Sequence, residues 1–310
     1  MEGLSKIDVV YVLGTGSKWH NNEIRFSLRA LEKNLRDYRH IYVVGIKPDW
    51  LKNVIHIPYE DQLIRNADGN IARKVLRVCQ EKDLTEEFLF INDDHLINKP
   101  VRAIDIPPYH KGDLTRYPEK YFQQSFWRGR LWRTKNVLLS KGFTTLHYDC
   151  HTPLVINKKL FSRAISQFDF EVNIGYTMKS MYANVVHGNS GHRLNGEKVT
   201  IFKKMTLKDI SRRCRNSRFV AVNDSGLNAA FKQWIFDTYP QPSQYESEGT
   251  NNGFIEVLTW LKGPRDYHEG IELFNRYGKS RKIKKFLEKS ETTARKMKLE
   301  HQMQELLNEL

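Results

Sequence analysis

Short apolar runs alternate with helical patterns along the first hundred residues. Each run is closed by glycine, proline or polar residues, which is typical of a buried strand. The runs are residues 7–13, 40–45, 54–57 and 88–91. Between them, leucine and isoleucine recur at helical spacing over 24–35, and Asn66 or Asp68 is expected to begin a second helix. Strands separated by helices predict an α/β fold, with a mostly parallel sheet flanked by helices.

The rest of the chain is less regular. Residues 105–205 interleave aromatic residues with arginines, and we expect an irregular insertion that walls one side of a cleft. A further strand over 219–222 precedes another helix. We therefore expect a catalytic domain over 1–246, which contains the insertion, and a helical basic appendage over 247–310.

Positive charge is concentrated in a few places. The 310-residue chain has 50 basic and 36 acidic residues, a net charge of +14 and a pI of about 9.5. Segments 128–141, 203–218 and 276–300 hold the excess. Such patches favour a polyanionic partner: nucleic acid, an anionic lipid surface or a phosphorylated substrate. The alternative is that each patch is a solvated face.

Several classes of protein are disfavoured. No stretch approaches the roughly 18 apolar residues of a membrane span, and the first residues run directly into a strand pattern, so neither a transmembrane segment nor a signal peptide is expected. Cys79, Cys150 and Cys214 are far apart, without the spacing of a zinc site or of a disulfide framework. These features predict a cytoplasmic protein.

The sharpest chemical signal is a pair of aspartates at the end of a strand. Asp93 and Asp94 follow the apolar run 88–91 directly. Adjacent carboxylates repel one another, and a divalent cation relieves that repulsion. We therefore expect Asp93 and Asp94 to hold Mg²⁺ or Mn²⁺ on the diphosphate of a nucleotide sugar, although the pair could also simply form a turn or a helix cap.

Two features of the first strand suggest a nucleotide contact. Asp8 is a carboxylate inside an apolar run, so it either bonds to backbone donors or faces a ligand. The turn that follows, Gly14, Thr15, Gly16 and Ser17, allows close approach of a pyrophosphate or a base. An ordinary turn is the alternative for the glycines.

Two further positions are candidates for proton transfer. His147 and His151 flank Asp149, and histidine is the natural base for an acceptor hydroxyl near neutral pH. Asp224 follows the strand 219–222, as Asp93 follows 88–91. A structural histidine and a helix cap are the respective alternatives.

Four stretches of the sequence, in order, resemble the Stealth family, which includes bacterial capsule sugar-phosphate transferases and N-acetylglucosamine-1-phosphotransferase. The first stretch begins with Asp8-Val-Val-Tyr11, and the second comprises Arg25 to Lys33 and Phe88 to Asp94. The third begins with His151-Thr-Pro153, and the fourth comprises Phe219 to Asp224 and Tyr239 to Glu246. Together they cover about 8–246 with gaps. The resemblance implies a nucleotide-binding core related to GT-A glycosyltransferases and an activated sugar as donor. By position, it makes Asp8, Asp93, Asp94, His151 and Asp224 site candidates.

We expect a metal-dependent transferase that moves a sugar from a nucleotide-activated donor to a hydroxyl on a polyanionic or cell-surface polymer. His151 or Asp224 is expected to deprotonate the acceptor. The family usually has an arginine some way after the third-region histidine, and none stands in 169–176. Glycosyl transfer is therefore preferred to sugar-1-phosphate transfer. The residues expected to hold the acceptor or the phosphates are Arg128, Arg130, Arg133, Arg212 and Arg213.

Three alternatives remain. A phage-type DNA glycosyltransferase acting on a hydroxymethylated base would use the basic patches for the DNA backbone. A capsule-type sugar-1-phosphate transferase follows from the resemblance. A non-catalytic polyanion-binding protein would bind neither metal nor nucleotide. In addition, segment 276–300 could touch an anionic membrane at its surface.

Overall fold

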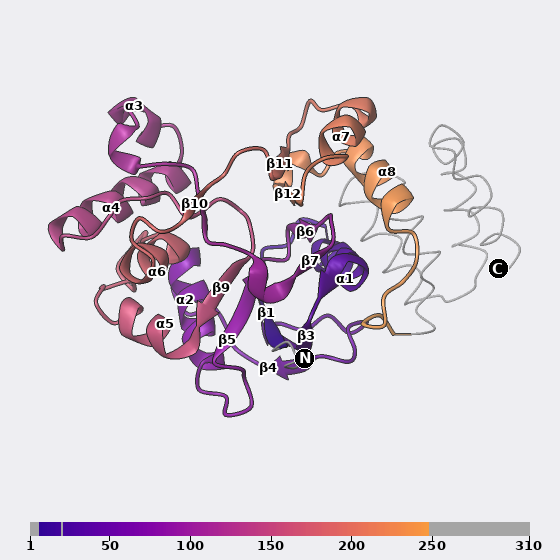
Figure 1. Cartoon of the computed structure of the whole chain (residues 1–310), viewed down its shortest axis with the longest axis horizontal. Helices are drawn as coiled ribbons and strands as arrows, with labels where there is room; N and C mark the ends of the chain where they lie inside the picture. Colours follow the sequence, from indigo (N-terminus) through magenta and orange to yellow (C-terminus); the bar gives the residue numbers. More distant parts are fainter. Residues whose placement is uncertain (1–5, 20, 248–310) are drawn as a thin grey trace, which may run out of the picture.

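A five-stranded sheet organises the chain (Figure 1). The computed structural model describes residues 6–19 and 21–247. The strand order is β4-β3-β1-β5-β9, and every pair is parallel except β5 with β9. The strands are β1 (Ile7–Leu13), β3 (Tyr38–Gly45), β4 (Ile55–Ile57), β5 (Glu87–Ile91) and β9 (Leu154–Asn157). The predicted α/β fold with a mostly parallel sheet is confirmed.

Helices cover both faces of this sheet. Alternate residues of β1 enter two separate apolar cores, because successive side chains of a strand point to opposite faces. Val10 and Val12 pack with α2 (Ala67–Val78), α5 (Lys158–Ile165) and α6 (Met178–Val186). Val9 and Tyr11 pack with α1 (Asn22–Asn34). Burial on both faces explains why the strands appear in the sequence as continuous apolar runs.

A second, three-stranded sheet lies beside the first. It has the order β11-β12-β6, formed by β11 (Lys198–Ile201), β12 (Phe219–Val222) and β6 (His95–Ile97). The turn Asn92-Asp93-Asp94 joins β5 of the large sheet to β6 of the small one. Helices α7 (Leu207–Cys214) and α8 (Ala229–Thr238) pack against the small sheet (Figure 1). The acidic turn therefore sits where the two sheets meet.

The segment 105–205 is more regular than expected. It contains α3 (Glu119–Phe122), α4 (Phe126–Ser140), α5, α6 and β9, which is an edge strand of the large sheet. The prediction of an irregular insertion is wrong here. In α4 the buried residues include Arg130 and Thr134, so the helical face does not stand out as an apolar stripe.

Short elements complete the described chain. They are β2 (Leu35–Arg36), β7 (Val101–Arg102), β8 (Tyr109–His110), β10 (His192–Arg193) and the 3₁₀ turns Ala103–Asp105, Leu114–Arg116 and Asp224–Gly226. In the part of the chain described here, none of the helices combines the length and apolar character needed to span a bilayer. The predicted basic appendage, 248–310 with segment 276–300, lies outside the described residues.

A buried ion cluster ties α1 to the end of the described chain. Glu246 accepts hydrogen bonds from Arg25 Nη1 at 2.7 Å and from Arg29 Nε and Nη2 at 2.8 Å. All three side chains are almost fully buried. These residues fall in two of the stretches that carry the family resemblance, so part of that pattern encodes folding rather than chemistry.

The structure corrects the expectation for Asp8. This residue lies at the amino end of β1, opposite Phe88 at the start of β5. Its carboxylate accepts hydrogen bonds from Arg39 and from the backbone N–H groups of His40 and Thr85, at 2.7–3.0 Å. Ligands of parallel sheets bind at the carboxyl ends of the strands. Asp8 therefore stabilises the fold, and its predicted nucleoside contact is wrong.

This environment makes the stability contribution of Asp8 depend on pH. Burial by itself raises the pKa of Asp8, but hydrogen bonds from Arg39, Thr85 and His40 bring it below the ordinary value of 3.8. A lowered pKa stabilises the fold above 3.8, and that stabilisation is lost as the pH falls through the folded value. Asp8→Asn should cost about 1.5–3 kcal/mol near pH 7. Urea unfolding should show this difference shrinking as the pH falls below 3.8, and a difference constant with pH would contradict the assignment.

Candidate functional site

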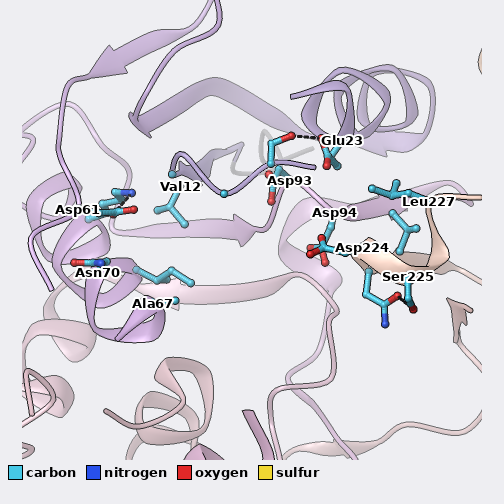
Figure 2. A pocket seen from close by; sticks show the side chains of 17 residues that line it. Val12, Glu23, Asp61, Ala67, Asn70, Asp93, Asp94, Asp224, Ser225 and Leu227 are labelled. Carbon is cyan, nitrogen blue, oxygen red and sulfur yellow. Dashed lines mark hydrogen bonds and ion pairs between the residues drawn. The ribbon is translucent and has the colours of Figure 1, made fainter. Parts of the chain in front are cut away.

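A cavity of about 670 Å³ opens at the carboxyl edge of both sheets. Its walls are the segments that follow β1, β5 and β12, together with one face of α2. This volume is typical of a small-ligand site. Figure 2 shows Asp61 and Asn70 at one end of the cavity and Asp94 and Asp224 at the other. The predicted position at the carboxyl ends of the strands agrees with this geometry.

The cavity is strongly acidic. Its lining includes five carboxylates and one ammonium group: Glu23, Asp61, Asp93, Asp94, Asp224 and Lys74. Burial, reinforced by repulsion from Asp94 and Glu23, raises the pKa of Asp93 to about 8. A site with this charge is stabilised when it binds a cation.

One end of the cavity is built by a lysine on α2. Lys74 is buried; its Nζ lies 2.7 Å from the carbonyl oxygen of Leu13 and 2.6 Å from Asp61 Oδ1. Asp61 approaches the turn after β1 so closely that a Cβ on Gly14 would lie 2.8 Å from Asp61 Oδ2. A side chain at this position would displace the Asp61 carboxylate, and the predicted contact of Gly14 with a pyrophosphate or a base stays a prediction.

At the other end, three side chains present potential metal ligands. Asp94, His95 and His151 each offer one ligand atom, and these atoms lie within 4.8 Å of one another. His95 Nε2 is 3.4 Å from Asp94 Oδ1, and His151 Nδ1 is 3.7 Å from Asp94 Oδ2. His95 is fully buried, yet neither ring nitrogen hydrogen bonds to any described residue. Buried polar atoms without partners are rare, and a metal ion would satisfy them here.

His151 is held in an unusual conformation. Its φ of 54° lies in the left-handed region, which is uncommon for a residue with a side chain. Two lysines hold the adjacent carbonyls: Lys198 Nζ donates to Cys150 O at 2.8 Å, and Lys179 Nζ donates to Thr152 O at 2.7 Å. The indole of Trp127 packs 6.1 Å from the His151 ring.

The ammonium groups of both lysines lie in a largely buried setting. Burial, together with neighbouring Lys111, lowers the pKa of Lys198 to about 7. Burial also lowers the pKa of Lys179, against the opposing pull of Asp149 and Asp94. Burial therefore reduces the positive charge that these two lysines keep beside His151.

The predicted loop residues have mixed outcomes. Gly14, Gly16 and Ser17 line the cavity, and Thr15 lies outside the lining. The Ser17 hydroxyl donates to Glu23 Oε2 at 2.7 Å, which fixes the turn against α1. Asp224 also lines the cavity, and its expected role in proton transfer stays a prediction. His151 lies beside it, next to Asp94.

The predicted arginines do not line the cavity. Arg130 is buried and donates to Asp68 and to the carbonyl of Ile174, so it joins α4 to α2, and its expected contact with acceptor or phosphate is wrong. Arg128 lies 4.3 Å from the ring of Tyr121, and Arg133 lies 5.9 Å from that of Tyr176. The role of Arg128 and Arg133, like that of Arg212 and Arg213 on α7, stays a prediction.

Sequence reasoning did not single out several site residues. Glu23 and Lys74 belong to helical patterns, in which a charged residue is ordinary. Lys179 and Lys198 belong to the segment that was expected to be irregular. Lys74 and Lys179 are nearly fully buried. His95 differs, because it directly follows the Asp93-Asp94 pair and the sequence alone makes Asn92 or His95 a candidate to complete the ligands of the metal.

Comparison with known sequences gives two relatives. The chain is 25% identical over 175 residues to a capsular polysaccharide phosphotransferase of Neisseria meningitidis serogroup B, which covers 50% of this chain and 46% of the relative. It is 33% identical over 93 residues to an exopolysaccharide phosphotransferase of Streptomyces coelicolor. That match covers 27% of this chain and 16% of the relative. The predicted resemblance is confirmed. The matches span less than half of either relative, and no family model matches the chain.

Similar solved structures are sugar transferases. The galactosyltransferase LgtC, in complex with donor and acceptor sugar analogues, has 11% identity, a TM-score of 0.41 and coverage of 78% of this chain and 98% of its own. A glycosyltransferase involved in glycosylation of the major capsid of PBCV-1 has 10% identity, a TM-score of 0.38 and coverage of 70% and 93%. Mouse xyloside xylosyltransferase 1 has 9% identity, a TM-score of 0.37 and coverage of 72% of this chain and 99% of its own.

Proposed function

We propose that this chain is a metal-dependent transferase that moves a sugar 1-phosphate from a nucleoside diphosphate sugar to an acceptor hydroxyl. The convergence of Asp94, His95 and His151 at the end of an acidic cavity carries the proposal. The cavity has the volume for a nucleotide. The printed names of both curated relatives, as phosphotransferases, support the same reaction class.

The residues present fit a divalent cation. Asp94, His95 and His151 would hold it, with Asp93 adjacent. Burial, with Lys179, His151 and Lys198 nearby, keeps the pKa of His95 well below its ordinary value, and neutral imidazole is the form that binds metals. A bound cation supplies charge neutralisation for the diphosphate. Because imidazole suits transition metals better than Mg²⁺, we propose Mn²⁺ as the preferred ion.

The transfer step follows from the charge distribution. The acceptor oxygen attacks the phosphorus that bears the sugar, the bond from that phosphorus to the bridging oxygen breaks, and a nucleoside monophosphate leaves. Asp224, on the cavity wall, accepts the acceptor's proton, because His151 is assigned to the cation. Lys179 and Lys198 hold the carbonyls on either side of His151, so they position this ring beside Asp94.

These lysines change the balance between the two reaction types. Glycosyl transfer was preferred because no arginine follows His151 at the expected distance. Lys179 on α6 and Lys198 on β11 bring two basic side chains to the backbone on either side of His151. Basic residues from distant segments thus lie next to His151, which weakens the argument from the missing arginine. Glycosyl transfer remains the second candidate, since it needs the same cavity and cation.

The nucleotide product separates the two candidates. Sugar-phosphate transfer from UDP-sugar or GDP-sugar releases a nucleoside monophosphate, whereas glycosyl transfer releases the diphosphate. Chromatography of the released nucleotide should therefore show UMP or GMP, in reactions supported by Mn²⁺ better than by Mg²⁺ and stopped by EDTA. Release of UDP or GDP would establish glycosyl transfer instead. Nucleotide binding unaffected by EDTA would contradict the metal site.

A further inference from the structure

A loop next to the cavity exposes one aromatic ring and two lysines. Residues 202–206 connect β11 to α7. Phe202 is 52% exposed, which is high for a phenyl ring. Lys203 and Lys204 are both exposed, and neither forms an ion pair within the described part of the chain. An exposed phenyl ring beside two exposed ammonium groups offers a ligand both an apolar face and positive charge.

The cavity wall holds this loop in place. β11 and β12 are parallel with Ile201 opposite Val222, so Phe202 and Asn223 leave the small sheet at the same edge. Asn228 Nδ2 donates to Lys203 O at 3.0 Å and to Phe202 O at 3.4 Å. A Cβ on Gly226 would lie 2.4 Å from the carbonyl oxygen of Ile201, so the two turns are in close contact. The loop therefore borders the Asn223–Leu227 wall.

Charge changes sign between the cavity and this border. Five carboxylates and one lysine line the cavity. Outside it, Lys203 and Lys204 are followed on α7 by three further basic residues: Lys208, Arg212 and Arg213. An anionic polymer is repelled from the interior and attracted to the border. The border therefore suits the acceptor, and the interior suits the cation-bound donor.

We propose that Phe202, Lys203 and Lys204 form an acceptor subsite for an anionic oligosaccharide. The phenyl ring covers the apolar face of one sugar ring, and the two ammonium groups pair with its acidic substituents. The inference rests on the proposed function, because the bound oligosaccharide is an acceptor only if one of its hydroxyl groups reaches the cavity. Binding to the subsite itself requires neither donor nor catalysis.

Three probes separate ring recognition from charge recognition. Short dextran sulfate offers both, neutral dextran offers rings alone, and inorganic polyphosphate offers charge alone. In the full chain, Lys203→Ser with Lys204→Ser should weaken dextran sulfate binding at least about fivefold. Phe202→Ser should weaken it about threefold and leave polyphosphate binding unchanged. Hydroxyl-radical footprinting should show Phe202 protected by dextran sulfate and not by neutral dextran.

Two exposed lysines at the amino edge of the five-stranded sheet serve as control. Lys6 and Lys82 are exposed beside the amino ends of β1 and β5. Lys6→Ser with Lys82→Ser removes the same charge and should leave dextran sulfate binding within about twofold. An equal loss in both double variants, or an unprotected Phe202, would overturn the subsite. The nucleotide-product experiment is independent of this outcome, so failure of the subsite and failure of the proposed function are distinguishable.

Discussion

Asp94→Asn should reduce transfer by at least about 10³-fold and abolish metal-dependent donor binding. Asp94 is the carboxylate that contacts both His95 and His151. An amide keeps the shape of the side chain but loses the charge, so the cation would lose its central ligand. Stopped assays of nucleotide release and thermal shifts with Mn²⁺ and UDP-sugar measure the two losses.

The same substitution should raise the stability of the metal-free chain. Asp94 repels the neighbouring Asp93 and contributes, after burial, to its raised pKa. Removing that repulsion stabilises the fold without metal by about 1 kcal/mol. Asp105→Asn, a loss of charge away from the cavity, is the control and should change neither activity nor stability strongly. Metal-dependent activity retained in Asp94→Asn would eliminate the proposed site.

Glu246→Ala should cost about 3–5 kcal/mol of unfolding free energy. The substitution removes the carboxylate shared by Arg25 and Arg29 and leaves two guanidinium groups buried beside it. Glu246→Gln keeps the shape and part of the hydrogen bonding, so its cost should be smaller. Urea unfolding followed by circular dichroism measures both.

An exposed ion pair provides the comparison for Glu246. Glu171 pairs with Arg73 at 2.7 Å, with 45% of the glutamate side chain exposed. Glu171→Gln should cost less than about 1 kcal/mol, because water screens surface pairs. Equal losses of unfolding free energy in Glu246→Gln and Glu171→Gln would show that the buried cluster stabilises the fold no more than an exposed ion pair. Folded Glu246→Gln should keep its affinity for metal, since Glu246 does not line the cavity.

Asp8 shows which sequence signal was available and missed. A carboxylate within an apolar strand suggested a ligand contact. Its position as the second residue of the strand, however, places it at the amino edge of a parallel sheet, away from the carboxyl ends where ligands bind. The direction of the strand, rather than the rarity of a buried acid, was the informative feature. Arg130 had no such local warning, because its partners Asp68 and Ile174 are far away in sequence.

By itself, the sequence determined the alternation of strands and helices, the parallel sheet and the acidic turns at its carboxyl edge. These depend on local periodicity and on the residues that directly follow each strand. Only the tertiary structure decided that His95, His151, Lys179 and Lys198 share one site. The physical reason is that β6 and β11 join a second sheet and β9 reverses direction in the first. Contacts between such distant segments are set by packing, which leaves no periodic trace in the sequence.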